Sequence, residues 1–183
     1  AFYKCSSLSE ITVDADNPVF TSLNNSLYDK SLTTLLRSRS DVTAISLPST
    51  VTTISPDAYS GCLGLINITI PDTISDVGVY AFAFCSNLTN VNYGSLTSIN
   101  PGVFSYCTSL TSINIPNSVT SIAPEAFYSC TSLSSIIIPD SVTSIAGNAF
   151  KNCTSLSFIR HESTSAPTIL PDYWNGTNES PFN

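Results

Sequence analysis

The chain has 183 residues, of which 42% are hydrophobic and 10% charged, and its net charge at pH 7 is −7. The apolar content suffices for one sizeable core, and no apolar run approaches the roughly 18 residues that a membrane span needs. Nucleic-acid binding is excluded because no basic patch could neutralise phosphates, and the densest basic stretch, Arg37 to Arg39, is followed two residues later by Asp41.

The N-terminal part combines the end of a repeat with one long unit. Residues 1–8 have the form of a repeat's last residues, and Leu8, Ile11 and Val13 then predict a short strand. A long unit at about residues 8–44 follows, and its apolar runs flank Asp29-Lys30-Ser31. We predict a small β-hairpin, formed by the runs around residues 27–28 and 34–36, inserted into one coil. Since the chain starts inside a repeat and has no methionine, we expect it to be a fragment.

Five repeats of about 23 residues follow, the third of them one residue short. Residues 110–132 and 133–155 are the clearest pair, because they match at nearly every apolar position. A fixed period of this length is typical of a solenoid, in which no single coil can bury its own apolar face. We assign residues 1–159 to this solenoid and residues 160–183, which are rich in Ser, Thr and Pro, to a degenerate C-terminal capping unit.

Each repeat contains one clear strand signal. The run Leu-x-x-Ile-x-Ile ends in strict alternation and is stopped by proline, which predicts a short strand with one buried face. The runs Val-x-x-Ile and Ala-Phe-x-x-Cys-x-x-Leu have spacings near three and predict turns or short helical segments. Stacked coils would therefore form one parallel sheet. In the short third repeat Gly94 replaces the proline, and we expect a local bend of the sheet edge there.

The combined pattern, Leu-x-x-Ile-x-Ile-Pro-x-x-Val-x-x-Ile-x-x-x-Ala-Phe-x-x-Cys-x-x-Leu, resembles the BspA-like leucine-rich repeat. The long unit, with Asp16-Asn17-Pro18 and Leu27-Tyr28-Asp29-Lys30, resembles the long unit found among those repeats. The resemblance covers residues 1 to about 160. It implies a right-handed leucine-rich solenoid on a secreted or cell-surface protein, associated with adhesion and protein binding, and it supplies no catalytic residues.

The residues that could carry chemistry favour structural roles. Cys62, Cys85, Cys107, Cys130 and Cys153 recur once per coil and are predicted to be buried, inert thiols. His161, the single histidine, is expected at an exposed edge without a nucleophile beside it. The acidic run from Asp14 to Asn17 lacks the glycine and distal glutamate of an EF-hand and is interpreted as a turn. We expect no enzyme activity, no cofactor and no metal site.

The outward side of the predicted sheet is the candidate binding face. One position in it, between the two core positions of each strand, varies in size and polarity from coil to coil. With Phe158 from the neighbouring outward position, it gives the candidate residues Thr12, Ser46, Thr69, Asn92, Asn114, Ile137, Phe158 and Arg160. The last three are expected to lie close together as a small binding hot spot.

The predicted function is a non-catalytic scaffold, outside the cell or on its surface, that binds a host or matrix protein. A structural spacer within a larger surface protein is one alternative. A carbohydrate-active β-helix enzyme is another, and the absence of clustered acids on the predicted face disfavours it.

Overall fold

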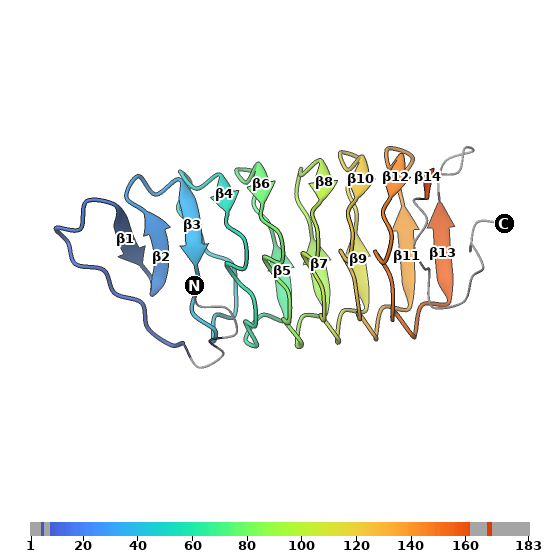
Figure 1. Ribbon diagram of the computed structural model, residues 1–183, viewed down its shortest axis with the longest axis horizontal. Helices are drawn as coiled ribbons and strands as arrows, with labels where there is room; N and C mark the ends of the chain where they lie inside the picture. Colours follow the sequence, from blue (N-terminus) through green and yellow to red (C-terminus); the bar gives the residue numbers. More distant parts are fainter. Residues whose placement is uncertain (1–4, 6–7, 162–167, 170–183) are drawn as a thin grey trace.

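The chain forms an elongated solenoid, in which coils stack from a hairpin at one end to strand β13 at the other (Figure 1). The computed structural model describes residue 5, residues 8–161 and residues 168–169. The described residues form strands and turns and contain no helix, so none of them belongs to a helix that could cross a membrane. Most of the C-terminal unit predicted at residues 160–183 lies outside the described residues, and the domain boundaries remain predictions.

The strands predicted from Leu-x-x-Ile-x-Ile form the first ladder. Strands β5, β7 and β9 pair in parallel, β11 lies beside β9, and β11 pairs in parallel with β13. The middle residue of each of the first three strands, Ile68, Val91 and Ile113, is buried, while both its neighbours are exposed. The sequence prediction of a parallel leucine-rich solenoid is thus confirmed. The strand bounds are β5 Asn67–Thr69, β7 Asn90–Asn92, β9 Ser112–Asn114, β11 Ser135–Ile138 and β13 Phe158–His161.

A second ladder runs where the sequence predicted turns or short helical segments, which corrects that expectation. It is made by the end of each Val-x-x-Ile run, where one coil hydrogen-bonds to the next, as from Ala123 N–H to the Ile99 carbonyl at 2.9 Å. The turns that follow cannot become helical, because each regular coil has two residues with positive φ. The strand bounds are β4 Thr53–Ile54, β6 Asp76–Val77, β8 Ser98–Ile99, β10 Ser121–Ile122, β12 Ser144–Ile145 and β14 Thr168–Ile169.

The long unit carries three strands, β1 (Phe20–Leu23), β2 (Ser26–Asp29) and β3 (Thr34–Arg37). Strands β2 and β3 contain the two runs from which a hairpin was predicted, and they pair in antiparallel register. Strand β1 was not predicted, and it pairs with β2 across a two-residue turn whose residues both have positive φ. Because β3 also pairs in parallel with β4, the hairpin extends the second ladder.

The strands expected at residues 8–13 and 45–47 do not form. Ile45 and Leu47 are only partly buried and pack against the edge of the core. Thr12 and Ser46 are nevertheless exposed between partly buried neighbours, so the alternation that predicted these strands survives without the ladder hydrogen bonds.

The core consists of side-chain columns, each with one residue from every coil. Successive rings in the aromatic column stack with centroids 5.1–5.8 Å apart. These rings are almost completely buried and contribute the largest apolar areas of the core. The column is formed by Tyr59, Phe82, Phe104, Phe127 and Phe150.

Serine and threonine, more than a quarter of the chain, add hydrogen bonds between coils. Thr120 Oγ1 donates to the Thr97 carbonyl at 3.3 Å, and Thr143 Oγ1 repeats this bond to Thr120 at 3.2 Å. Another column does the same along the other edge, where Thr111 Oγ1 donates to the Thr89 carbonyl at 3.2 Å. The abundant hydroxyl groups are therefore part of the stacking and not only a polar surface.

The short third repeat interrupts the second ladder. The first ladder crosses it unbroken through β7, so Gly94 in place of the proline does not interrupt strand pairing there, and the local bend stays a prediction. Gly94 has φ +63°, and a Cβ on it would lie 2.6 Å from the Ile70 carbonyl oxygen, so the close turn requires glycine. Strands β6 and β8 do not pair, and the side chain of Asn100 donates to the Val77 carbonyl at 2.7 Å, replacing a ladder hydrogen bond.

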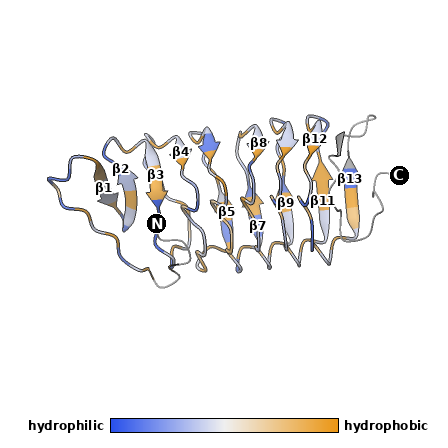
Figure 2. Cartoon of the chain, viewed as in Figure 1, coloured by the Kyte–Doolittle hydropathy of each residue, from blue (hydrophilic) through white to orange (hydrophobic). Residues whose placement is uncertain are grey.

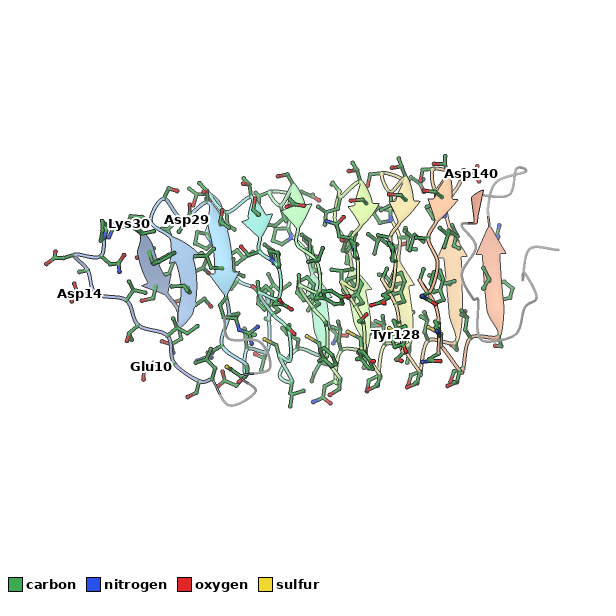
Figure 3. All side chains as sticks on the ribbon, viewed as in Figure 1. Glu10, Asp14, Asp29, Lys30, Tyr128 and Asp140 are labelled. Carbon is green, nitrogen blue, oxygen red and sulfur yellow. The ribbon has the colours of Figure 1, made fainter. Side chains whose placement is uncertain are left out.

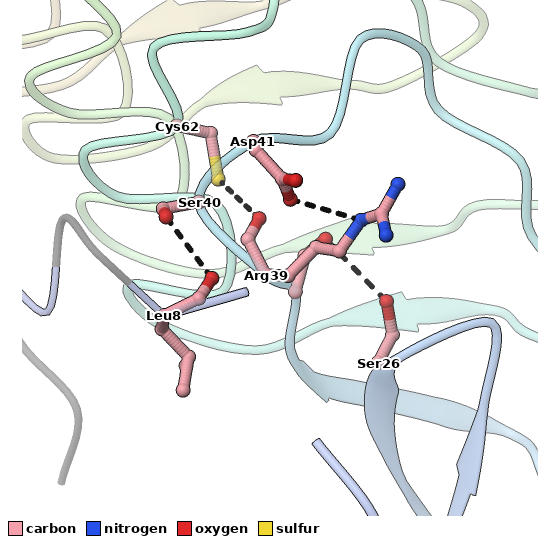
Figure 4. Close-up of polar contacts among 7 residues, drawn as sticks. Leu8, Ser26, Arg39, Ser40, Asp41 and Cys62 are labelled. Atoms are coloured by element: carbon pink, nitrogen blue, oxygen red, sulfur yellow. Dashed lines mark hydrogen bonds and ion pairs between the residues drawn. The ribbon is translucent and has the colours of Figure 1, made fainter. Parts of the chain in front are cut away.

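Polar contacts join the long unit to the first regular coil (Figure 4). Cys62 Sγ of the first regular coil donates to the Arg39 carbonyl at 3.2 Å, and within the long unit Ser26 donates a 3.4 Å hydrogen bond to Ser38. Buried Arg37 donates to the Asp57 carbonyl and, at 3.0 Å, to the Ser60 carbonyl. These carbonyls belong to the first regular coil, so Arg37 caps the end of the regular stack.

Candidate protein-binding face

The first ladder places five of the eight candidate residues in one column on its outward side. Thr69 pairs in register with Asn92, and Asn92 with Asn114, while in the next pair of strands Ile137 lies opposite Arg160. All five are exposed. The period of the repeat predicted this column, because equivalent residues of a solenoid become neighbours about 4.8 Å apart.

Phe158 belongs to the second outward column, two residues before Arg160 on β13. It lies opposite Ser135, whose small side chain leaves the ring uncovered, and 54% of its surface is exposed. Ile137 is 48% exposed. We name the surface of Ile137, Phe158 and Arg160 the β11–β13 patch. Strands β11 and β13 are mostly orange in Figure 2, whereas the exposed residues of β5, β7 and β9 are polar.

The remaining two candidates, Thr12 and Ser46, are exposed but lie in segments without strands. They are therefore not aligned with the column by ladder pairing. Thr12 belongs to the long unit, and the 23-residue period does not carry through that unit. Ser46 lies 23 residues before Thr69, but its segment forms no strand.

The second outward column forms a chain of hydrogen bonds that the sequence analysis did not predict. Asn90 Nδ2 donates to Asn67 Oδ1 at 2.8 Å, and Ser112 Oγ donates to Asn90 Oδ1 at 3.0 Å. The sequence feature that could have predicted these bonds is the recurrence of amide and hydroxyl residues at the repeat spacing. These bonds leave the N-terminal half of the face polar and already hydrogen-bonded along the stack.

The five regularly spaced cysteines are buried, as predicted, and all six described cysteines are unpaired. Each buried thiol donates to a backbone carbonyl of the preceding coil, as from Cys107 Sγ to Phe82 at 3.2 Å. Burial raises the pKa of Cys62 to about 12, although the Arg37 charge opposes it, and raises the pKa of Cys153 to about 12. The neutral thiol is therefore the stable form, which is the opposite of an activated nucleophile.

The acidic run near the N-terminus forms turns, as predicted. Asp14 Oδ1 accepts from the Asp16 N–H at 2.8 Å, and Asn17 Oδ1 accepts from the N–H groups of Val19 and Phe20. Across the described part of the chain, no three His, Cys, Asp or Glu side chains are close enough to hold a metal ion. The labelled charged side chains around the hairpin, Glu10, Asp14, Asp29 and Lys30, lie away from β11 and β13 (Figure 3).

The repeat pattern of the BspA type leucine rich repeat region matches residues 34–157 in six copies. The chain belongs to this family. A leucine rich cell surface protein from Faecalibacterium prausnitzii has a similar crystal structure, with a TM-score of 0.82 and 36% identity. That similarity covers 89% of this chain and 44% of the other, so the chain spans less than half of that protein. No curated protein sequence matches the chain significantly.

Two further solved structures share the fold at lower identity. A leucine-rich repeat protein from Eubacterium ventriosum has a TM-score of 0.70 at 24% identity, over 95% of this chain and 58% of its own. A leucine-rich repeat protein of T. pallidum has a TM-score of 0.61 at 25% identity, over 70% of this chain and 75% of its own.

Proposed function

We propose that this BspA-type repeat protein is a non-catalytic scaffold of a secreted or cell-surface protein, and that the outward face of its first ladder binds a protein. The observation that carries the proposal is that residue identity is nearly constant along the core columns and varies along the outward face. Core columns repeat nearly the same residue in each coil, whereas the outward column changes from Thr69 to Asn92, Asn114, Ile137 and Arg160. A rigid stack whose outward face varies from coil to coil is suited to recognition.

The bacterial cell-surface relative supports an extracellular location, because it shares 36% identity over 89% of this chain. Two half-exposed apolar side chains on an otherwise polar face support binding by that face, since large exposed apolar groups often mark interaction sites. We infer that the partner is a host cell-surface or extracellular-matrix protein.

Surface plasmon resonance against a panel of matrix and cell-surface proteins tests the proposal. We expect saturable binding by the wild type and its loss in the Ile137→Ser/Phe158→Ser variant. The matched control, Leu63→Ser/Val79→Ser, changes two exposed apolar residues that belong to no strand of the first ladder and should leave binding unchanged. Circular dichroism establishes that each variant is folded.

The alternative function, a structural spacer in a larger surface protein, predicts a different result. A spacer would bind no member of the panel, and the variants would behave like the wild type. Binding that survives the Ile137→Ser/Phe158→Ser change would move the site away from this patch, with the hairpin as the next surface to test.

A further inference from the structure

Within the proposed binding function, the structure points to the chemistry of the partner: we propose that the β11–β13 patch binds a protein segment in which a carboxylate lies next to an apolar side chain. The geometry is set by the ladder. Ile137 lies opposite Arg160, and Phe158 lies two residues before Arg160 on the same side of β13. Neighbouring strands lie about 4.8 Å apart, and residues two apart on one strand lie about 6.6 Å apart. One short segment can therefore contact all three residues.

The patch differs from the rest of the face because its apolar side chains are exposed to water, whereas polar side chains elsewhere on the face are already hydrogen-bonded. In the coils of β5, β7 and β9, Asn67, Asn90 and Ser112 hydrogen-bond to one another along the stack. Ile137 and Phe158 have about half of their surface in water. A partner that covers apolar surface gains about 25 cal/mol of free energy for each Å² removed from water. We therefore expect binding to be most favourable at this end of the face.

Arg160 supplies the charge that selects the partner. Arg160 is exposed and forms no ion pair with any described residue. The one ion pair in the described part of the chain joins Arg39 to Asp41 at 3.0 Å, in the long unit. The other outward residues of β5 to β11 are uncharged, so no second charge on these strands competes with Arg160. A guanidinium binds a carboxylate through two parallel hydrogen bonds. The complementary partner therefore presents a carboxylate over Arg160.

The apolar pair distinguishes a protein segment from an acidic glycan. A sulfated or carboxylated glycan would satisfy Arg160 but would leave Ile137 and Phe158 without an apolar partner. An aliphatic or aromatic side chain beside an aspartate or glutamate satisfies both requirements at once.

The test uses fluorescence anisotropy with the full 183-residue chain and three labelled decapeptides. The first has Asp flanked by Leu and Phe in a Gly-Ser background, the second replaces Asp with Lys, and the third replaces Leu and Phe with Ser. The wild type is expected to prefer the first peptide at least 10-fold over the others. Arg160→Gln, or the Ile137→Ser/Phe158→Ser variant, is expected to reduce that binding at least 10-fold. Arg39→Gln, a change at a partly buried arginine in the long unit, is the matched control and should have no effect.

A charge exchange makes the test specific. Arg160→Glu should lose the Asp peptide and gain the Lys peptide, which a merely unfolded variant cannot do. The proposal is overturned if no peptide binds the wild type, if Arg160→Gln binds like the wild type, or if heparin binds through Arg160 independently of Ile137 and Phe158. Matrix-protein binding that ignores Arg160 would overturn this inference alone, whereas no binding to any panel protein would overturn the proposed function itself.

Discussion

The hydroxyl of Tyr80 donates a 3.0 Å hydrogen bond to the carboxylate of Glu125, two coils further along the stack. The tyrosine ring reaches that far because Gly102 stands at the equivalent position of the intervening coil. A Cβ on Gly102 would lie 2.0 Å from Tyr80 Cε1. One side chain thus bridges three successive coils, and the missing Cβ is what allows it.

Gly102→Ala is expected to lower the free energy of unfolding by about 2–4 kcal/mol. The new methyl group would displace the Tyr80 ring, and the backbone, at φ +61°, would add about 1–2 kcal/mol of left-handed strain. Gly61→Ala is the matched control, because Gly61 has φ +74° but open space around its Cβ. Gly61→Ala should therefore lower the free energy of unfolding only by the backbone strain, about 1–2 kcal/mol.

Chemical denaturation of both variants checks this prediction, together with Gly102→Ala in a Tyr80→Ala background. There, the penalty of the alanine should fall to that of Gly61→Ala. Equal penalties for Gly102→Ala and Gly61→Ala in the wild-type background would show that the Tyr80 ring moves aside at no cost.

Arg37 is 2% exposed and caps the end of the regular stack. Arg37→Met keeps much of the side-chain volume but leaves the carbonyls of Asp57 and Ser60 without this donor. Because hydrogen bonds to charged groups contribute about 1.5–3 kcal/mol each, we expect the loss of both bonds to lower the unfolding free energy by about 3–6 kcal/mol. Arg39→Met, which removes an ion pair on the surface, should cost less than about 1 kcal/mol. A smaller loss at Arg37 than at Arg39 in urea denaturation would contradict the capping role.

The parts of the fold that follow from the repeat period were predictable from the sequence. Register is fixed by the period, so the alignment of Asn92 with Asn114, and of Ile137 with Arg160, could be predicted without coordinates. The second ladder was missed because strands as short as Ser121–Ile122 have no alternating pattern to detect.

Contacts made by residues that break the repeat were not predictable. The hydrogen bond from Tyr80 to Glu125 depends on a glycine in the coil between them, and the burial of Arg37 depends on how the hairpin joins the first coil. Thr12 failed to join the face for a related reason, since the long unit does not keep the 23-residue period that defines the ladder. Ser46 does keep that period with Thr69, and nothing in the structure explains why its segment forms no strand.

Asp29 should make the hairpin sensitive to acid. Its carboxylate accepts hydrogen bonds from Ser31 Oγ at 2.5 Å, Thr33 Oγ1 at 2.7 Å and the N–H groups of Thr33 and Thr34. Desolvation raises the pKa of Asp29, but these bonds outweigh it and lower the pKa to about 2. A depressed pKa in the folded state stabilises the protein above the unfolded pKa near 4, and the effect is lost as the pH falls toward 2.

Asp29→Ala should therefore destabilise the protein at pH 6 and have almost no effect at pH 2, if both proteins are still folded there. The exposed Asp140 provides the control variant, Asp140→Ala, for the loss of one negative charge. Carboxyl NMR titration of the wild type gives the pKa of Asp29 directly. A midpoint near 4 would show that the four hydrogen bonds do not favour the ionised form.

The six thiols should react in two separate classes. Cys5 is exposed, whereas the other five are buried, and each of these donates its S–H to a carbonyl of the preceding coil, as Cys130 does to Phe104 at 3.1 Å. Burial raises the pKa of Cys107 and of Cys130, so almost no thiolate exists at neutral pH, and the thiolate is the reacting species. With Ellman's reagent at pH 7.5, we expect one thiol to react within minutes in the folded chain and all six in 6 M guanidinium chloride. Cys5→Ser should abolish the fast reaction and leave the slow class unchanged. A second fast thiol in that variant would mean that the cysteine column opens to solvent, and with it the coils that hold the binding face in register.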